Sequence, residues 1–147
     1  MRVASKTPLT LGNLIEKGIH DYPWISRRFL AVSCNWVLEH VPHFQDNNPG
    51  QAMLVYAQRN AKEMKTWEPL LIQEVGRYAV IQHTKKLYPK MPYDELYRRA
   101  TSKSDLVKSA LRGAPSCIPY SPVKTLQEVY EACQRNTLQW RNPLDFN

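Results

Sequence analysis

The stretch LLIQEVGRYAVIQHTKKL, residues 70–87, decides the fold class of this 147-residue chain. Its apolar residues lie on more than one side of a helix: Leu70, Leu71, Ile72, Val75, Tyr78, Ala79, Val80 and Ile81. A helix that is apolar on several sides is packed on several sides. The run YAVI also fits a short strand, but its flanks have helical spacing. We therefore expect a central helix from near Trp67 to about Leu87, with Pro69 in its first turn.

The residues before this stretch also repeat at helical spacing, between breaks made by proline and glycine. Thr10 is expected to cap a helix over residues 11–21. Further helices are expected over residues 23–40, opened by a proline, and over residues 50–66. Between these two, residues 42–50 are rich in Asn, Asp, Pro and Gly, a composition typical of a loop.

Three more helices are expected after the central one. A short helix should span residues 92–100, and Ser102 or Ser104 should cap the next, which Gly113 ends in the left-handed conformation. A proline-rich connection then leads to a last helix ending near residue 141. Thr125–Glu128 matches a capping box at its start.

The composition agrees with this architecture. Hydrophobic residues make up 43% of the chain and charged residues 22%, which is typical of soluble globular proteins. We expect an all-α fold, a compact bundle of about five to seven helices with proline-rich connections. It should form a single domain over residues 1–147, with 142–147 as an irregular C-terminal tail. The sequence has no apolar run near the roughly 18 residues of a membrane span, and no secretory signal. A cytoplasmic protein without membrane contact is expected.

Catalytic and metal-binding patterns are missing from the sequence. It contains no GxxxxGK[ST], GxGxxG, GxSxG or HExxH motif. A proline separates His40 from His43, so we expect His40 to bond the last carbonyls of its helix rather than a metal. Three cysteines without CxxC spacing predict neither a disulfide framework nor a zinc site, and Cys34 and Cys133 are expected in the core. We expect no enzyme, no cofactor and no metal.

The positive charge is concentrated in one part of the chain. Residues 76–113 contain nine Lys or Arg and three Asp or Glu, whereas the net charge of the whole chain is +7. The remaining residues therefore carry almost none of the surplus. Lysines kept only for solubility would be spread along the chain, so this concentration favours a basic face with an anionic partner.

Within this region, a helix start flanked by Ser102 and Ser104 is the first candidate for phosphate contact. Arg98, Arg99 and Lys103 converge on it, with no nearby acid expected to balance the two arginines. Lys108 and Arg112 fall on the polar face of the following helix, whose other face is apolar. Their position is therefore explained equally well if they only form the solvent-exposed side of an amphipathic helix. The predicted nucleic-acid-binding residues are Arg98, Arg99, Lys103, Lys108, Arg112, Lys85, Lys86, Lys90 and Arg77.

Tyrosines are interleaved with these cations at positions 78, 88, 93 and 97. Single-stranded nucleic acids are bound by aromatic rings that stack on bases and by cations that follow the phosphates. The alternative is structural, because Tyr93 and Tyr97 are four residues apart and can cover the core from one helix face.

Two kinds of partner remain open for the basic face. A non-catalytic subunit that grips a nucleic-acid backbone, of DNA or RNA, would bind with steep salt dependence and little sequence preference. A helical adaptor or inhibitor that docks on an acidic protein would also lose affinity in salt, but nucleic acid would compete with it poorly.

In length, charge and helix content the whole chain resembles the small subunit of class 1 CRISPR effector (Cascade-type) complexes. This resemblance rests on these overall properties and not on a sequence motif. It implies a cytoplasmic subunit for antiviral defence that packs against other protein subunits, including copies of itself. It also implies contact with the guide–target heteroduplex or the displaced single strand of a ribonucleoprotein complex.

Overall fold

Seven α-helices and no strand make up the part of the chain that the structure describes. The structure, a computed structural model, describes residues 10–102 and 104–140. For residues 101, 102 and 104 it describes the backbone but not the side chain. The helices are α1 (Leu11–Asp21), α2 (Arg27–His40), α3 (Pro49–Arg59), α4 (Ala61–Leu87), α5 (Tyr93–Ser102), α6 (Ser104–Ala110) and α7 (Pro122–Thr137). The all-α prediction is confirmed, and YAVI is helical. The predicted tail, 142–147, and Lys103 lie outside the described residues.

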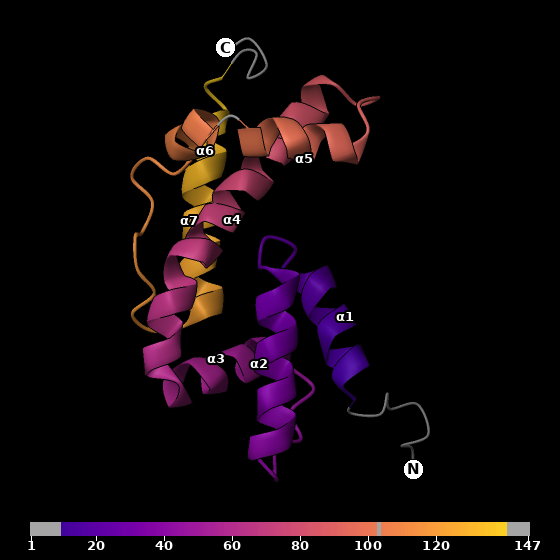
Figure 1. Cartoon of the computed structure of the whole chain (residues 1–147), viewed down its shortest axis with the longest axis vertical. Coiled ribbons are helices and arrows are strands. Elements are labelled where there is room, and N and C mark those ends of the chain that lie inside the picture. The colour runs from indigo at the N-terminus through magenta and orange to yellow at the C-terminus, as the bar shows by residue number, and fades with distance from the viewer. Residues whose placement is uncertain (1–9, 103, 141–147) are drawn as a thin grey trace.

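Helix α4 is the central element, as its breadth of apolar residues predicts. It is 27 residues long, about 40 Å at 1.5 Å per residue. It contacts α3, α5, α6 and α7, and Figure 1 shows it running through most of the length of the molecule. Its buried residues include Leu71, Val75, Gly76 and Val80, which lie on several sides of the helix.

The predicted boundary between the third and fourth helices is wrong. The third helix ends at Arg59 rather than Thr66, and α4 begins at Ala61 rather than near Trp67. Asn60 makes the break: its backbone, with φ of −124° and ψ of 50°, leaves the helical region, and its Nδ2 donates to the Tyr56 carbonyl at 3.0 Å. Pro69 therefore lies inside α4 rather than in its first turn. It is exposed, so the carbonyl that loses a donor there lies on the solvent side.

The helix caps decide the other boundaries. Thr10 caps α1 as predicted, accepting from the Asn13 N–H at 3.2 Å. Helix α2 starts after Ser26, not at Pro23. Helix α7 starts after Ser121, so the predicted capping box is wrong and Thr125 is buried inside the helix. Pro at the first helical position explains that start, because it needs no hydrogen-bond acceptor there. Gly113 adopts the predicted left-handed conformation, with φ of 77°.

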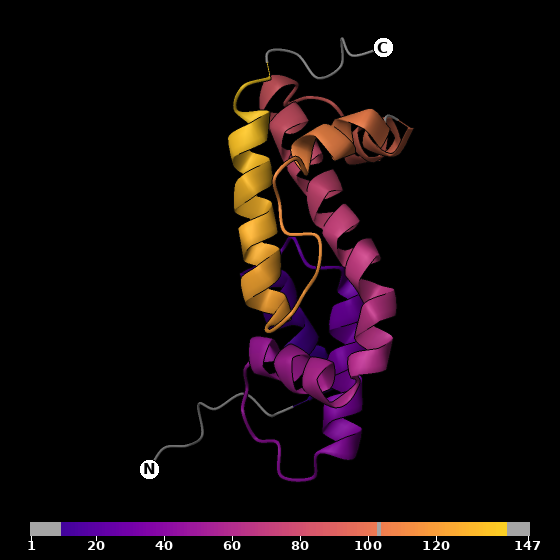
Figure 2. The same cartoon turned by 90° about the vertical axis from the view of Figure 1, so that its left-hand side faces the viewer.

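The helices form two layers that share one core. Helices α1, α2 and α3 pack together at one end, and α4 and α7 run side by side in the same direction to the other end (Figures 1 and 2). The connection after α6 returns along these two helices to the start of α7, as Figure 2 shows. Buried side chains form one continuous cluster from Leu14 to Cys133. None of the described helices has the length and apolar content that a membrane-spanning helix needs.

Candidate functional site

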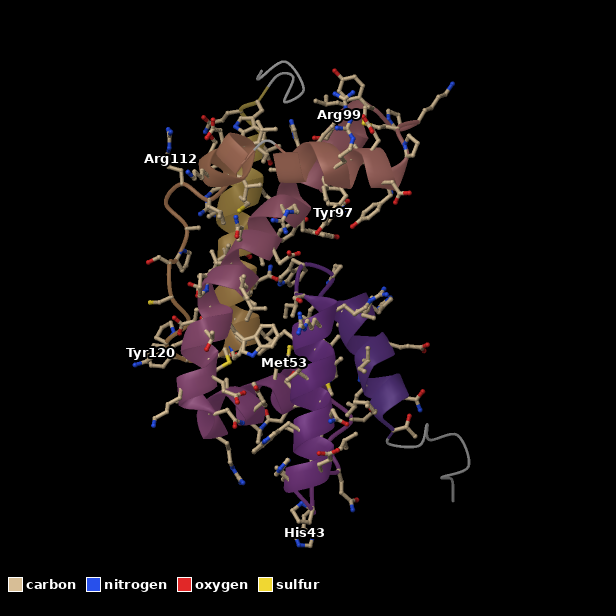
Figure 3. The ribbon with its side chains drawn as sticks, in the orientation of Figure 1. His43, Met53, Tyr97, Arg99, Arg112 and Tyr120 are labelled. Atoms are coloured by element: carbon tan, nitrogen blue, oxygen red, sulfur yellow. The ribbon has the colours of Figure 1, made fainter. Side chains whose placement is uncertain are left out.

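The predicted cations come from consecutive elements that meet at one end of the molecule. Arg77, Lys85 and Lys86 lie on α4, Lys90 on the loop after it, Arg98 and Arg99 on α5, Lys108 on α6 and Arg112 just beyond. The last part of α4 and helices α5 and α6 form one end of the bundle (Figure 1), where Figure 3 shows Arg99 and Arg112. We call this end, from Lys85 to Arg112, the basic end. Lys103 belongs to the same stretch of sequence but is not among the described residues.

Arg98 and Arg99 are not without an acidic neighbour, contrary to the prediction. Arg98 donates to both carboxylate oxygens of Glu95, with Nε 3.1 Å from Oε2 and NH2 2.6 Å from Oε1. Arg99 Nε donates to the same Oε1 at 2.8 Å. These hydrogen bonds lower the pKa of Glu95 from 4.5 to about 2. The signal was present in the sequence, because residues three and four positions apart are neighbours on a helix.

Arg77 is also engaged within the protein. Its guanidinium donates to Glu74 and lies over the ring of Tyr97, 5.7 Å from the centroid. Only 15% of its side chain is exposed. Arg77 therefore forms part of an inner wall between α4 and α5 and does not belong to the outer surface of the basic end.

The remaining predicted cations are exposed and carry no carboxylate partner within residues 10–102 and 104–140. They are Lys85, Lys86, Lys90, Lys108 and Arg112. Lys85 and Lys86 lie in the last turn of α4, where the helix dipole favours positive charge. That dipole is worth roughly half a charge, less than the two lysines supply. A surplus of accessible positive charge therefore remains at this end.

Packing of α7 beside α4 adds a cation that the sequence pattern did not single out. Arg135 lies with Lys86 along a groove of about 390 Å³ between the two helices. The groove is also lined by Gln82, His83, Glu131 and Gln134. Burial and the nearby Lys86 lower the pKa of His83, so its ring is neutral near pH 7. No local pattern could place Arg135 here, since it is far from Lys86 in sequence.

A second cleft, of about 430 Å³, lies where α4 and α5 face the turn between α1 and α2. Tyr93 and Tyr97 line it with 61% and 41% of their surfaces exposed. They do not serve mainly to cover the core, which leaves their rings accessible for stacking. Arg27, at the start of α2, lines the opposite wall and was also missed. A pair of arginines following a helix-capping serine was the available sequence signal.

The histidines and cysteines have local roles. His40 Nδ1 lies 2.9 Å from the Trp36 carbonyl, as expected of a histidine at a helix end. His43 lies at the end of the molecule opposite the basic end (Figure 3). Cys34 and Cys133 are buried as predicted, and burial raises their pKa values to about 11 and about 12. The described residues contain no group of three or more His, Cys, Asp or Glu placed to hold a metal.

Comparisons with known proteins leave these surfaces as the basis for functional inference. No protein family, curated protein or solved structure matches the chain.

Proposed function

We propose that this protein is a non-catalytic basic helical subunit that binds a nucleic-acid backbone within a larger ribonucleoprotein complex. The observation that supports it is the group of exposed cations at the basic end without carboxylate partners among the described residues: Lys85, Lys86, Lys90, Lys108 and Arg112. Point charges of this kind neutralise phosphates without reading sequence. The proposal includes the CRISPR small-subunit role, with the guide–target heteroduplex or displaced strand as ligand and neighbouring subunits as partners.

We assign the phosphates of a nucleic acid, rather than an acidic protein, as the partner because the cations are dispersed over several helices and loops. Lys85 and Lys86 end α4, Lys90 lies in the following loop and Lys108 lies on α6. A phosphate backbone presents charge at regular intervals and matches such a spread surface. Each contact releases counterions, so five contacts give a slope of log K against log salt of about −4.5 on duplex DNA and about −3.5 on single strands.

The test is a titration with single-stranded DNA, RNA and duplex at two salt concentrations. In one variant, Lys85, Lys90 and Lys108 are changed to Glu. The matched control changes Arg59, Lys62 and Lys65 to Glu; these cations are also exposed but lie where α3 meets α4, at the other end of α4. Both variants lower the net charge equally. We expect affinity to fall by at least tenfold in the first variant and much less in the control.

An equal loss of affinity in the two variants would show that only net charge matters. Because a complex subunit gains affinity when several copies align, binding is also measured with the protein tethered at high density on a surface. Absence of binding there as well contradicts a backbone-binding role.

One observation favours the alternative, an adaptor or inhibitor that docks on an acidic protein. The loop at the basic end has a shallow apolar hollow lined by Leu87, Tyr88, Pro89, Met91 and Pro92, and 42% of Leu87 is exposed. A protein partner can bury such a surface, whereas a phosphate backbone cannot. Under this alternative, polyglutamate competes for the basic end better than nucleic acid does. The same titration, repeated with polyglutamate as competitor, distinguishes the two.

A further inference from the structure

The cleft between α5 and the α1–α2 turn combines aromatic rings with unpaired donors. Its volume of about 430 Å³ is in the usual range of small-ligand sites. Figure 3 shows Tyr97 on the side of α5 that faces the α1–α2 turn. Trp24, Arg27 and Tyr93 also line the cleft. Glu74 is the one carboxylate among the described residues that line it, and it accepts a hydrogen bond from Arg77.

The two tyrosines form a platform with a fixed inner side. Their ring centroids are 6.3 Å apart, and the planes are tilted by 32°. The Arg77 guanidinium lies over the Tyr97 ring, which holds that ring in place. Their outer surfaces remain open, with exposed fractions of 61% and 41%. Base-on-ring stacking contributes roughly 1–3 kcal/mol per base, so such a platform suits an aromatic ligand.

The opposite wall is suited to an anion. Arg27 and Arg28 occupy the first turn of α2, and this turn contains no acidic residue. Neither arginine takes part in an ion pair among the described residues. Cations at a helix N-terminus oppose the dipole, and an anion beside them removes that conflict. An aromatic platform and an anion position on facing walls match the base and the phosphate of one nucleotide.

Two of the residues that line the cleft also carry buried donors. Trp24 Nε1 and Arg77 Nε are both buried and have no hydrogen-bond partner among the residues that the structure describes. Buried donors are normally paired, so each unpaired one requires an explanation. A base brings ring nitrogens and carbonyl oxygens, which are the acceptors that such donors need.

We propose that this cleft holds one unpaired nucleotide, with its base on Tyr93 and Tyr97 and its phosphate at Arg27 and the start of α2. This rests on the proposed function and narrows it to nucleic acid with single-stranded segments. A base within a duplex is stacked on its neighbours and cannot enter, so the cleft adds affinity for single strands alone.

The test uses adenosine monophosphate, adenosine and a single-stranded oligonucleotide carrying 2-aminopurine, whose fluorescence falls on stacking. We expect the unaltered protein to bind the monophosphate and to quench the oligonucleotide. The double variant Tyr93→Ala/Tyr97→Ala should lose single-strand affinity on the order of tenfold and keep duplex affinity. Tyr93→Phe/Tyr97→Phe should retain binding because the rings remain. Arg27→Gln should abolish the preference for the monophosphate over adenosine.

Tyr120→Ala is the matched control, since Tyr120 is 83% exposed and lies away from the cleft (Figure 3). An equal effect of Tyr120→Ala, or no quenching and no monophosphate binding, overturns the nucleotide site. These outcomes are separable from the fate of the proposed function. Equal binding of duplex and single strand, lost on charge reversal at the basic end, retains backbone binding and rejects the cleft. Binding of adenosine monophosphate without binding of any polymer retains the nucleotide site in the cleft and rejects backbone binding.

Discussion

Glu95 controls how much positive charge α5 presents to a partner. It accepts hydrogen bonds from both Arg98 and Arg99, and these bonds lower its pKa from 4.5 to about 2. A carboxyl group whose folded pKa is depressed contributes stability above its unfolded pKa, and the contribution is lost as pH falls through the folded value. Glu95 is therefore ionised throughout the neutral range, and its charge opposes phosphate binding.

Changing Glu95 to Gln should strengthen nucleic-acid binding. The substitution removes one negative charge and lets the Arg98 guanidinium turn towards phosphate. One further phosphate contact raises affinity by roughly two- to eightfold at moderate salt. The gain should be constant between pH 5 and pH 9, because Glu95 does not titrate there. Fluorescence anisotropy with a labelled oligonucleotide measures it.

The control for this substitution is Glu16→Gln, which makes the same change of charge at an exposed residue of α1, away from the basic end. A similar gain in both variants would attribute the effect to net charge. Weaker binding by Glu95→Gln would mean that the ion pairs position the arginines for phosphate contact, contrary to our interpretation.

At the scale of single elements, Gly76 lets α6 approach α4 closely. A Cβ placed there would lie 2.8 Å from Leu111 Cγ and 3.0 Å from Val107 Cγ1. Leu106, Val107 and Ala110 are buried on this side, and the opposite side of α6 carries exposed Lys108. The seating of α6 on Gly76 therefore sets the position of Lys108 at the basic end.

Gly76→Val should destabilise the protein and displace α6. Overpacking of this kind costs about 1–3 kcal/mol, measured as a lower midpoint of urea denaturation. Gly12→Val is the control, because no atom lies within 4 Å of a Cβ at Gly12, and it should not lower the midpoint. If Gly76→Val is as stable as the unaltered protein, α6 is not held by this contact.

The start of α1 was predicted correctly from its capping residue, whereas the start of α7 was not, because two neighbouring sequence patterns both fit a helix start. Thr10 caps α1 through a hydrogen bond from the Asn13 N–H, three residues later in the chain. At the last helix, Thr125–Glu128 fits a capping box, but Ser121 followed by Pro122 fits a helix start as well, and the structure uses the earlier one. Burial of Thr125 and Leu126 against the core favours that choice, and a local pattern contains no information about such burial.

At the scale of the whole molecule, α4 joins the two layers through one continuous core. Phe29 of α2 meets Tyr56 of α3 and Trp67 of α4 edge-on, at 5.9 and 5.2 Å. On the other side of α4, Val129 and Cys133 of α7 belong to the same buried cluster. The layers therefore have no separate cores along which they could come apart.

Unfolding should accordingly be a single transition for both layers. Urea denaturation followed by the NMR amide signals of α2 reports on the layer formed by α1, α2 and α3. Amide signals of α7, followed by NMR, report on the other layer. The two curves should coincide, as two-state behaviour requires. Loss of the α7 signals at clearly lower urea would show that the layers unfold separately.

The sequence by itself determined the helical class, most helix positions and the region of the chain that carries the positive charge. These follow from apolar spacing, prolines, glycines and residue counts, which are local properties. The tertiary structure decided how far Arg77 is exposed, because it places Tyr97 of α5 against the Arg77 guanidinium on α4. It also brought Arg135 to Lys86, and Arg27 to Tyr97, through the packing of α4. These pairs are far apart in the chain, and contact between distant residues depends on how whole helices bury their apolar faces.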